Sequence, residues 1–382
     1  MMTAELWITI TLTFLTIVYV WKIAGFHRGL SLVRKGTNTV PHTLTVIVPA
    51  RNEEVNIAAL LRCLIAQDYP AGKFSVIVVD DQSTDRTAEI VRAIAQDSPV
   101  PITQLESDLS SSVRSPKIRA LIQGIQHSLS EIIVTTDADC TMGTRWLASV
   151  NAAFEEHVGV VTGVTSYSDD ASIGPVFRGI QYLDFISYTA IAAGAVGLGR
   201  VLVSNGSNMA FRIQAFDETG GFDALTHINT GDDSLLAQQL TAGGKWRAQF
   251  LFGPDATVLT QPVRTWKAML HQRMRWVGQT AYYPADMMFF MICTFILYVA
   301  LGVLVPAALF FSLSIVWFVL LAKFGMDFLI MSRFTKLSGT SDVMRYFLPT
   351  AIIHIPFVLL ATVGGYFFTF EWKERSMKKE AA

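Results

Sequence analysis

Residues 74–85 read FSVIVVDDQSTD, an apolar run that ends in two aspartates and a helix-start signal. Phe74–Val79 is short, rich in β-branched residues and free of Gly and Pro, which is typical of a buried strand. The Ser and Asp residues of 83–85 favour the start of a helix. Asp80 and Asp81 are therefore predicted to stand at the carboxyl end of a strand, where α/β proteins bind their ligands.

The same pattern occurs on either side of this stretch. Leu44–Val48 reads as a second apolar strand, and Asn56–Ala66 follows it with apolar residues on one helical face. Ile132–Thr135 reads as a third strand, which ends just before Asp137 and Asp139. Strands that alternate with helices predict an α/β fold with a mostly parallel sheet.

The composition indicates membrane spans beside this domain. Only 16% of the 382 residues are charged, against about 25% in typical soluble domains, and the mean hydropathy is +0.40. The excess apolar residues lie in residues 6–21 and 286–370. The formal net charge of −1 predicts no nucleic-acid partner. The three cysteines are far apart in the sequence and form no metal or redox spacing.

The charges around the first apolar run predict its orientation. Glu5 precedes Leu6–Trp21, and four basic residues follow the run: Lys22, Arg28, Arg34 and Lys35. By the positive-inside rule, this predicts an uncleaved anchor with the following domain in the cytoplasm. We therefore expect an integral protein of the cell or inner membrane.

Three further spans are predicted near the carboxyl end. They are Met287–Leu304, Pro306–Leu321 with an extension to about Ile330, and Tyr346–Phe370. This count places the basic tail outside, against the rule, unless one segment is re-entrant or interfacial. The predicted organisation is an anchor and linker (1–40), an α/β domain (41–265), an interfacial helix (266–285) and a membrane region with its tail (286–382).

One apolar segment is not predicted to cross the membrane. Phe185–Val203 is apolar enough for a span, but inserting it would put Asp137 and Asp233 on opposite sides of the bilayer. We interpret it as a buried or membrane-grazing helix within the α/β domain.

Asp137 and Asp139 are candidate metal ligands. Residues i and i+2 of an extended segment face the same way, so both carboxylates can reach one cation. Oxygen ligands suit Mg²⁺ or Mn²⁺, and such an ion would keep coordination sites open for a further ligand. The alternative is a solvated acidic loop.

Several short motifs follow one another in an order that points to a known family. They are Pro49–Glu54, Asp80-Asp81, Lys117–Leu121, Asp137–Asp139, Gly231–Asp233 and Gln272–Trp276. In this order the chain resembles the membrane-bound family 2 glycosyltransferases over about residues 43–276. The resemblance implies a GT-A fold (a Rossmann-like α/β domain), Mg²⁺ or Mn²⁺, and inverting transfer of a sugar from a nucleotide diphosphate to a hydroxyl.

The resemblance also implies donor-binding residues. Asp81 would contact the base, which we expect to be uracil, with Asp80 as its neighbour. Pro49 and Glu53 would frame the nucleoside. Lys117 would lie near the diphosphate, and Asp137 would bind the donor through a metal ion at the same diphosphate. Capping and turn formation are the alternative for the aspartate pair, and solvation is the alternative for the lysine.

The remaining motifs concern the acceptor. In the family, the second member of the Asp232-Asp233 pair is the base, so Asp233 would take the acceptor's proton; Asp232 lies where it could instead cap a helix. Gln272, Arg275 and Trp276 would share one helix face. The resemblance implies that Arg275 clamps the diphosphate while Gln272 and Trp276 shape the acceptor site. The alternative is an interfacial helix anchored at the lipid headgroups.

Three functions remain open from the sequence. The few spans leave little wall for a polymer channel, so we favour transfer to a lipid or lipid-linked acceptor. A processive polysaccharide synthase with the same donor site is the second hypothesis. The third, more distant one is a non-catalytic membrane transport or scaffold protein that only binds nucleotide.

Overall fold

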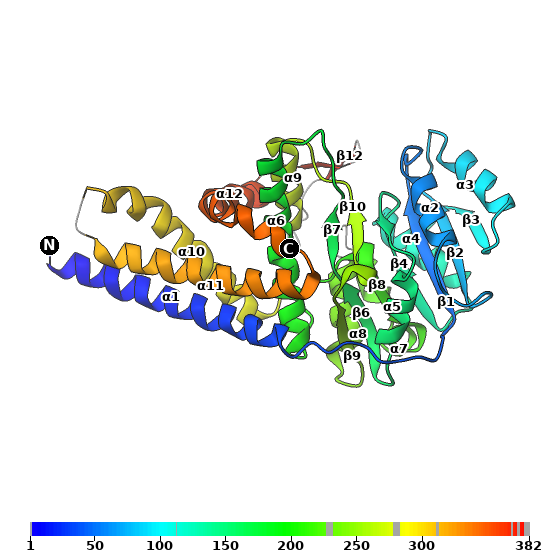
Figure 1. Ribbon diagram of the computed structural model, residues 1–382, viewed down its shortest axis with the longest axis horizontal. Coiled ribbons are helices and arrows are strands. Elements are labelled where there is room, and N and C mark those ends of the chain that lie inside the picture. The colour runs from blue at the N-terminus through cyan, green and yellow to red at the C-terminus, as the bar shows by residue number, and fades with distance from the viewer. Residues whose placement is uncertain are drawn as a thin grey trace.

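The computed structural model describes residues 2–111, 113–226, 232–277, 283–310, 313–367, 370–372 and 375–377. Side chains at 2–4, 232, 370–372 and 375–377 lie outside this description. Figure 1 shows an elongated molecule, with long helices at one end and an α/β domain at the other.

A seven-stranded sheet forms the centre of the α/β domain. Its order is β3-β2-β1-β4-β8-β6-β9. The bounds are Leu44–Ala50 (β1), Phe74–Asp80 (β2), Ile102–Glu106 (β3), Ile132–Thr135 (β4), Val158–Gly163 (β6), Met209–Arg212 (β8) and Arg247–Leu251 (β9). Only β8 runs antiparallel to its neighbours in this sheet. The predicted mostly parallel sheet is confirmed, and the three predicted strands are β1, β2 and β4.

Alternate residues of the central strands pack on opposite faces of this sheet. Val46 and Val48 of β1 belong to one apolar core, whereas Ile47 belongs to the other. The helices that contribute to the first core are Ile57–Ile65 (α2), Thr87–Gln96 (α3) and Trp146–Ala153 (α5). Those that contribute to the second are Pro116–Gln126 (α4), Ile213–Glu218 (α7) and Asp232–Ala242 (α8). The sheet is therefore covered by helices on both sides, as parallel sheets require.

A small second sheet borders the carboxyl end of β4. It contains β5 (Thr141–Met142), β10 (Val258–Thr260) and β7 (Thr165–Tyr167), in that order. β5 starts two residues after Asp139, so this sheet adjoins the metal-ligand candidates.

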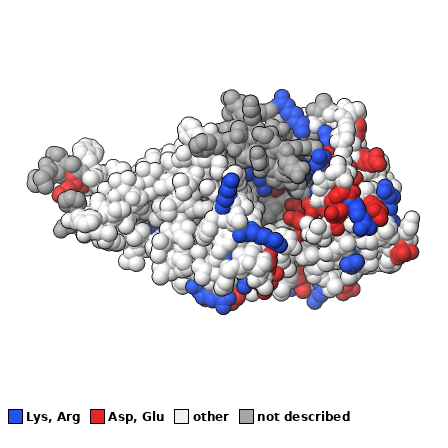
Figure 2. Space-filling view, turned by 90° about the horizontal axis from the view of Figure 1, so that it is seen from above, with Lys and Arg blue, Asp and Glu red and all other residues white. Residues whose placement is uncertain are grey.

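Within the part of the chain that the structure describes, four helical segments are long and apolar enough to cross a membrane: 5–30, 285–308, 314–338 and 341–367. They comprise α1 (Met2–Leu30), α10 (Ala285–Ala308), α11 (Ser314–Ser338), and η5 (Ser341–Tyr346) with α12 (Phe347–Phe367). Figure 2 shows that charged side chains gather over the α/β domain, while the helical end is almost free of them on this face. The predicted number of apolar segments is therefore matched. Lys373, Lys378 and Lys379 of the predicted basic tail lie outside the described residues.

The predicted boundary between the second and third apolar segments was wrong. Pro306 was expected to begin a span, but it lies inside α10, and α11 begins at Ser314. A proline removes a single backbone donor, and helices in an apolar bundle tolerate it. Its place near the end of α10 makes the interruption smaller still.

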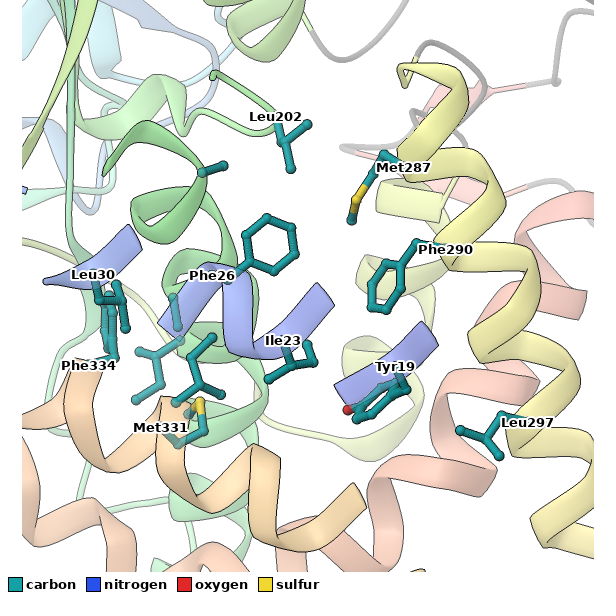
Figure 3. Packing of buried hydrophobic residues seen from close by; sticks show 14 of the residues in the cluster. Tyr19, Ile23, Phe26, Leu30, Leu202, Met287, Phe290, Leu297, Met331 and Phe334 are labelled. Atoms are coloured by element: carbon teal, nitrogen blue, oxygen red, sulfur yellow. The ribbon is translucent and has the colours of Figure 1, made fainter. Parts of the chain in front are cut away.

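The predicted buried helix, Phe185–Val203, matches α6 (Pro175–Gly197) only in part, because α6 begins earlier and ends at Gly197. α6 crosses α1 at very close range. A Cβ atom on Gly29 of α1 would overlap the carbonyl oxygen of Gly194 in α6, so only glycine fits this crossing. α6 is not among the candidate spans, and its buried residues join an apolar core shared with α1, α10 and α11. Figure 3 shows this core, with Tyr19, Ile23 and Phe26 of α1 between the other helices. Through α6, this core continues into the α/β domain.

Candidate active site

One large cavity joins the carboxyl edge of the sheet to the long helices. Its volume is about 1130 Å³. Ten predicted site residues line it: Pro49, Glu53, Asp81, Lys117, Asp137, Asp139, Asp233, Gln272, Arg275 and Trp276. The same cavity is lined by Tyr298 of α10, Lys323 of α11 and His354 of α12. A single space therefore connects the predicted donor site with the candidate spans.

Asp137 and Asp139 lie close enough to share a cation. One ligand atom from each of Asp137, Asp139 and Cys140 lies within 4.8 Å of the others. Burial raises the pKa of the Cys140 thiol well above its usual range, and both aspartates add to this, so the sulfur stays protonated. The two carboxylates are hard oxygen ligands, which suit Mg²⁺ or Mn²⁺, and a neutral thiol does not. The residues present therefore fit a divalent cation held by the aspartates.

Lys117 connects this acidic pair with Asp233. Its Nζ lies 2.8 Å from Asp137 Oδ1, and Pro116 and the Ser115 N-cap place it in the first turn of α4. A Cβ atom on Gly206 would lie 2.9 Å from Lys117 Nζ and 3.2 Å from Asp233 Oδ2. The lysine and Asp233 thus approach the same glycine, and the three polar groups belong to one site.

Two backbone N–H groups hold the Asp233 carboxylate. The N–H of Gly206 donates to Oδ2 at 2.7 Å, and the N–H of Ser234 donates to Oδ1 at 2.8 Å. Each oxygen retains further lone pairs for a ligand. Asp232 is the first residue of α8, so it lies at a helix start, where the sequence pattern placed it. Its side chain and Gly231 lie outside the described part of the chain.

Two arginines surround the carboxylate of Asp81. Arg119 Nη2 donates to its Oδ1 at 2.8 Å, and Arg51 Nη1 lies 3.4 Å from its Oδ2 and 2.7 Å from its carbonyl oxygen. Asp80 has a different environment, because its Oδ1 accepts from both the hydroxyl and the N–H of Ser83. Asp80 is not among the cavity-lining residues, and its bonds fix the turn that presents Asp81.

Glu53 is held between the first strand and the third helix. Its N–H donates to Thr87 Oγ1 at 2.7 Å, and its Oε2 accepts from Asn56 Nδ2 at 2.8 Å. The preceding Asn52 has φ +52°, a left-handed conformation that asparagine tolerates well. This turn brings the buried Glu53 carboxylate to the cavity wall next to Pro49.

α9 (Trp266–Val277) carries Gln272, Arg275 and Trp276, which form the QxxRW motif, along the cavity. Within it, Arg273 is only 1% exposed, and its Nε donates to Asp184 Oδ2 of α6 at 2.6 Å. The guanidinium also lies 4.1 Å from the ring centroid of Trp276 and donates to Gln272 Oε1. Arg273 therefore orients two of the three predicted motif residues and ties α9 to α6.

Burial perturbs the ionisable groups around this pair. It raises the pKa of Asp184 against the opposing effect of Arg273, and it raises the pKa of Tyr167, whose hydroxyl lies 3.4 Å from Gln272 Oε1. Tyr283, also on the cavity wall, has its pKa raised to about 12 by burial and by the charge of Asp233.

Arg273 and Asp184 are the residues that sequence reasoning missed. The motif pattern treats position 273 as variable, and Asp184 immediately precedes the segment that was read only for its apolar character. A lone carboxylate in an apolar helix was the available signal, because such a group needs a partner. The arginine of an adjoining amphipathic helix is that partner.

Comparison with known proteins shows which family this is. The family model described as glycosyl transferase family 21 matches residues 7–378. The chain belongs to glycosyl transferase family 21. The motifs resemble family 2, so the match confirms the enzyme class and gives a different family number.

Two curated relatives match much of the family 21 chain. It is 26% identical over 261 residues to the probable glycosyltransferase YdaM of Bacillus subtilis, covering 67% of this chain and 59% of that protein. It is 30% identical over 237 residues to a beta-monoglucosyldiacylglycerol synthase of Nostoc sp., covering 61% of this chain and 48% of that protein. The chain therefore spans between about half and three fifths of the length of these relatives.

A solved structure shares the overall fold. The mannosyltransferase PcManGT of Pyrobaculum calidifontis, in complex with GDP-Man and Mn²⁺, has a TM-score of 0.60 and 21% sequence identity. The match covers 94% of this chain and 99% of that chain. The predicted GT-A-type fold with additional helices is thereby confirmed.

Proposed function

We propose that this family 21 glycosyltransferase moves a sugar from a nucleotide diphosphate, in the first place a uridine diphosphate, to the hydroxyl of a membrane lipid. The observation that carries the proposal is the continuous cavity of about 1130 Å³, which reaches from the strand-end carboxylates to the candidate spans. A water-soluble donor and a lipid acceptor can approach such a space from opposite ends.

The donor would lie over the carboxyl ends of β1, β2 and β4. Pro49 and Glu53 line the cavity there, and Asp81 faces it with a carboxylate oriented by Arg119. An oriented carboxylate can accept hydrogen bonds from the N–H groups of a base. Arg275 lines the same cavity from α9 and would supply positive charge to the diphosphate.

Asp137 and Asp139 would hold a Mg²⁺ or Mn²⁺ ion. When bound, this ion would supply the positive charge that the departing diphosphate requires. Lys117 pairs with Asp137, so an ammonium group stands beside the same carboxylate. In this arrangement the lysine orients Asp137 and adds charge near the phosphates.

Asp233 would take the proton of the acceptor hydroxyl. Its carboxylate is fixed by the N–H groups of Gly206 and Ser234, which hold it in a single orientation toward the cavity. A fixed base on the side of the sugar opposite the diphosphate would favour in-line attack with inversion.

The acceptor would come from the bilayer, with the catalytic domain on the cytoplasmic side. The four candidate spans and the basic residues after the first apolar run support this placement. The name of the Nostoc relative, a monoglucosyldiacylglycerol synthase, supports a lipid with a free hydroxyl as acceptor.

The test is release of nucleoside diphosphate by the purified chain in phosphatidylcholine nanodiscs. UDP-glucose, UDP-N-acetylglucosamine and GDP-mannose are supplied with Mn²⁺ or Mg²⁺, with and without membrane lipid extract. We expect release from one donor that requires both the cation and the lipid extract. Asp233→Asn should reduce it by at least about a hundredfold, as loss of a general base does.

Asp97→Asn is the matched control, because Asp97 is an exposed C-cap residue of α3 and does not line the cavity. It should retain full release. Unchanged release by Asp233→Asn would remove that residue from its role. Lipid-independent release that yields a polymer would favour the processive hypothesis.

A further inference from the structure

A polar cluster lies among the apolar helices at the far end of the cavity. It consists of Tyr19 of α1, Thr294 and Tyr298 of α10, Lys323 and Asp327 of α11, and His354 of α12, all of which line the cavity. None of these residues belongs to a sequence motif of the donor site. We call this set the helix-bundle cluster.

Lys323 and Asp327 form the charged centre of the helix-bundle cluster. Lys323 is 1% exposed, and its Nζ lies 2.7 Å from Asp327 Oδ2, one helical turn away. The hydroxyl of Tyr19 donates to Asp327 Oδ1, and Figure 3 shows Tyr19 between α10 and α11. The two charges compensate each other, so the cluster favours an uncharged ligand.

Two groups of the helix-bundle cluster, Lys323 Nζ and Thr294 Oγ1, have no hydrogen-bond partner among the described residues. The Lys323 ammonium carries three N–H donors. It lies 2.7 Å from Asp327 Oδ2, but among the described residues no acceptor makes a well-aligned hydrogen bond with it. The Tyr298 hydroxyl lies 3.5 Å from His354 Nδ1. The Thr294 hydroxyl, one turn before Tyr298, is buried and has no hydrogen-bond partner among the described residues.

Bundle stability alone does not account for this arrangement. A buried ion pair is usually no more stabilising than apolar residues of the same size, and a buried hydroxyl without a partner destabilises the fold. A threonine in a helix can satisfy its hydroxyl on the carbonyl four residues earlier, as Thr16 does on Leu12 at 2.7 Å. Thr294 makes no such bond, which leaves its hydroxyl available to a ligand.

The helix-bundle cluster adjoins the predicted acceptor side of the active site. Tyr188 of α6 packs edge-on against Trp276, with ring centroids 5.8 Å apart. Burial raises the pKa of Tyr188 well above its usual range, and Asp184 and Tyr298 add to this through their proximity. Polar side chains therefore continue from the QxxRW helix through Tyr188 to Tyr298 and Lys323.

We propose that the helix-bundle cluster binds the carbonyl oxygen of an acyl lipid, which places the lipid's free hydroxyl in the active site. A carbonyl oxygen is uncharged and accepts two hydrogen bonds, which matches the unpartnered donors of Lys323 and Thr294 and the balanced charge. This inference rests on the proposed function, since it names the class of acceptor for that site. The acyl chains would occupy the apolar part of the same cavity.

The test compares two lipid probes that differ in their carbonyl groups. The chain in phosphatidylcholine nanodiscs is titrated with dioleoylglycerol and with the corresponding dioleyl ether of glycerol, which keeps the hydroxyl and lacks the carbonyls. We expect the ester to bind roughly tenfold more tightly, because about one hydrogen bond to a buried donor is lost in the ether.

Thr294→Val is the first variant, because it removes the unpartnered hydroxyl at nearly constant volume. It should bind the ester several times more weakly and the ether unchanged, with no loss of thermal stability. The double variant Lys323→Gln, Asp327→Asn removes both charges together. It should also reduce the difference in affinity between the ester and the ether. Thr16→Val is the matched control, because the Thr16 hydroxyl hydrogen-bonds within α1 and Thr16 does not line the cavity. This variant should keep the full difference in affinity between the ester and the ether.

Binding of UDP with Mn²⁺, measured on the same samples, separates this inference from the proposed function. Equal binding of ester and ether by the wild-type chain, or no binding of either, would overturn the inference even where UDP binds. Failure of UDP binding with the ester preference intact would instead contradict the proposed donor site. An ester preference that Thr294→Val and the double variant both leave unchanged would assign carbonyl recognition elsewhere and overturn the role of the cluster.

Discussion

Replacing Arg273 by methionine should destabilise the chain strongly, because the change leaves the Asp184 carboxylate buried without its counterion. The two side chains are 1% and 3% exposed, and the Nε–Oδ2 distance is 2.6 Å. Removing one partner of such a buried pair typically costs about 3–5 kcal/mol. Arg273→Met also removes the cation 4.1 Å from the Trp276 ring, so donor turnover should fall as well.

The matched control is the double variant Asp184→Leu, Arg273→Met. Apolar residues of similar size can replace a buried ion pair with little loss, so this variant should recover most of the stability that Arg273→Met loses. The assay is guanidinium unfolding in detergent micelles, followed by tryptophan fluorescence. A loss below about 1 kcal/mol for Arg273→Met, or a double variant as unstable as the sum of both single variants, would refute this reasoning.

The pH dependence supplies an independent check on the same pair. Burial raises the pKa of Asp184 in the folded chain, and Arg273 opposes that shift. Without the arginine the folded pKa rises further above the unfolded value of about 3.9. A carboxyl group whose pKa is raised in the folded chain contributes to stability at low pH. This contribution is lost as the pH rises through the folded-state pKa. Arg273→Met should therefore lose less stability near pH 4.5 than at pH 8, relative to wild type.

Three further outcomes follow from particular contacts. Gly29→Ala should lower the melting temperature in detergent, because its methyl group would overlap the Gly194 carbonyl. Gly25→Ala should leave the melting temperature unchanged, because no atom lies within 4 Å of the added carbon. Equal melting temperatures for the two variants would contradict the close crossing. Glu131 accepts hydrogen bonds from the Thr43 N–H and hydroxyl, which lower its pKa. Glu131→Gln should therefore be less stable than wild type at neutral pH and equally stable in acid. Urea unfolding at several pH values measures this difference. The Cys140 thiol, buried and with a raised pKa, should resist N-ethylmaleimide at pH 7 in the folded chain while the less buried Cys63 reacts, which mass spectrometry of peptides would test.

Local sequence patterns predicted much of the sheet. β1, β2 and β4 are short apolar runs bounded by polar residues, so their periodicity alone located them within one or two residues. The strand-end rule also placed Asp81 and Asp137 on one cavity, because parallel neighbours present their carboxyl ends at the same edge. These features depend on a few neighbouring residues.

Features that depend on contacts between distant segments were not predicted. The close crossing of α1 and α6 depends on Gly29 meeting Gly194, and no local pattern gives that pairing. The same holds for Asp184 with Arg273, and for Tyr19 with Asp327 across 308 residues. In the Asp80-Asp81 pair, the resemblance had assigned the ligand contact to Asp81, and Asp81 is the one that lines the cavity while Asp80 bonds Ser83 in the turn.

The most direct test of the account is mass spectrometry of the lipids after the chain in nanodiscs of membrane lipid extract has been incubated with sugar nucleotide and Mn²⁺. The account predicts a lipid heavier by one sugar residue, absent with Asp233→Asn and absent when a chelator removes the cation. A sugar polymer without a glycolipid, or a glycolipid that forms equally well with Asp233→Asn, would contradict it.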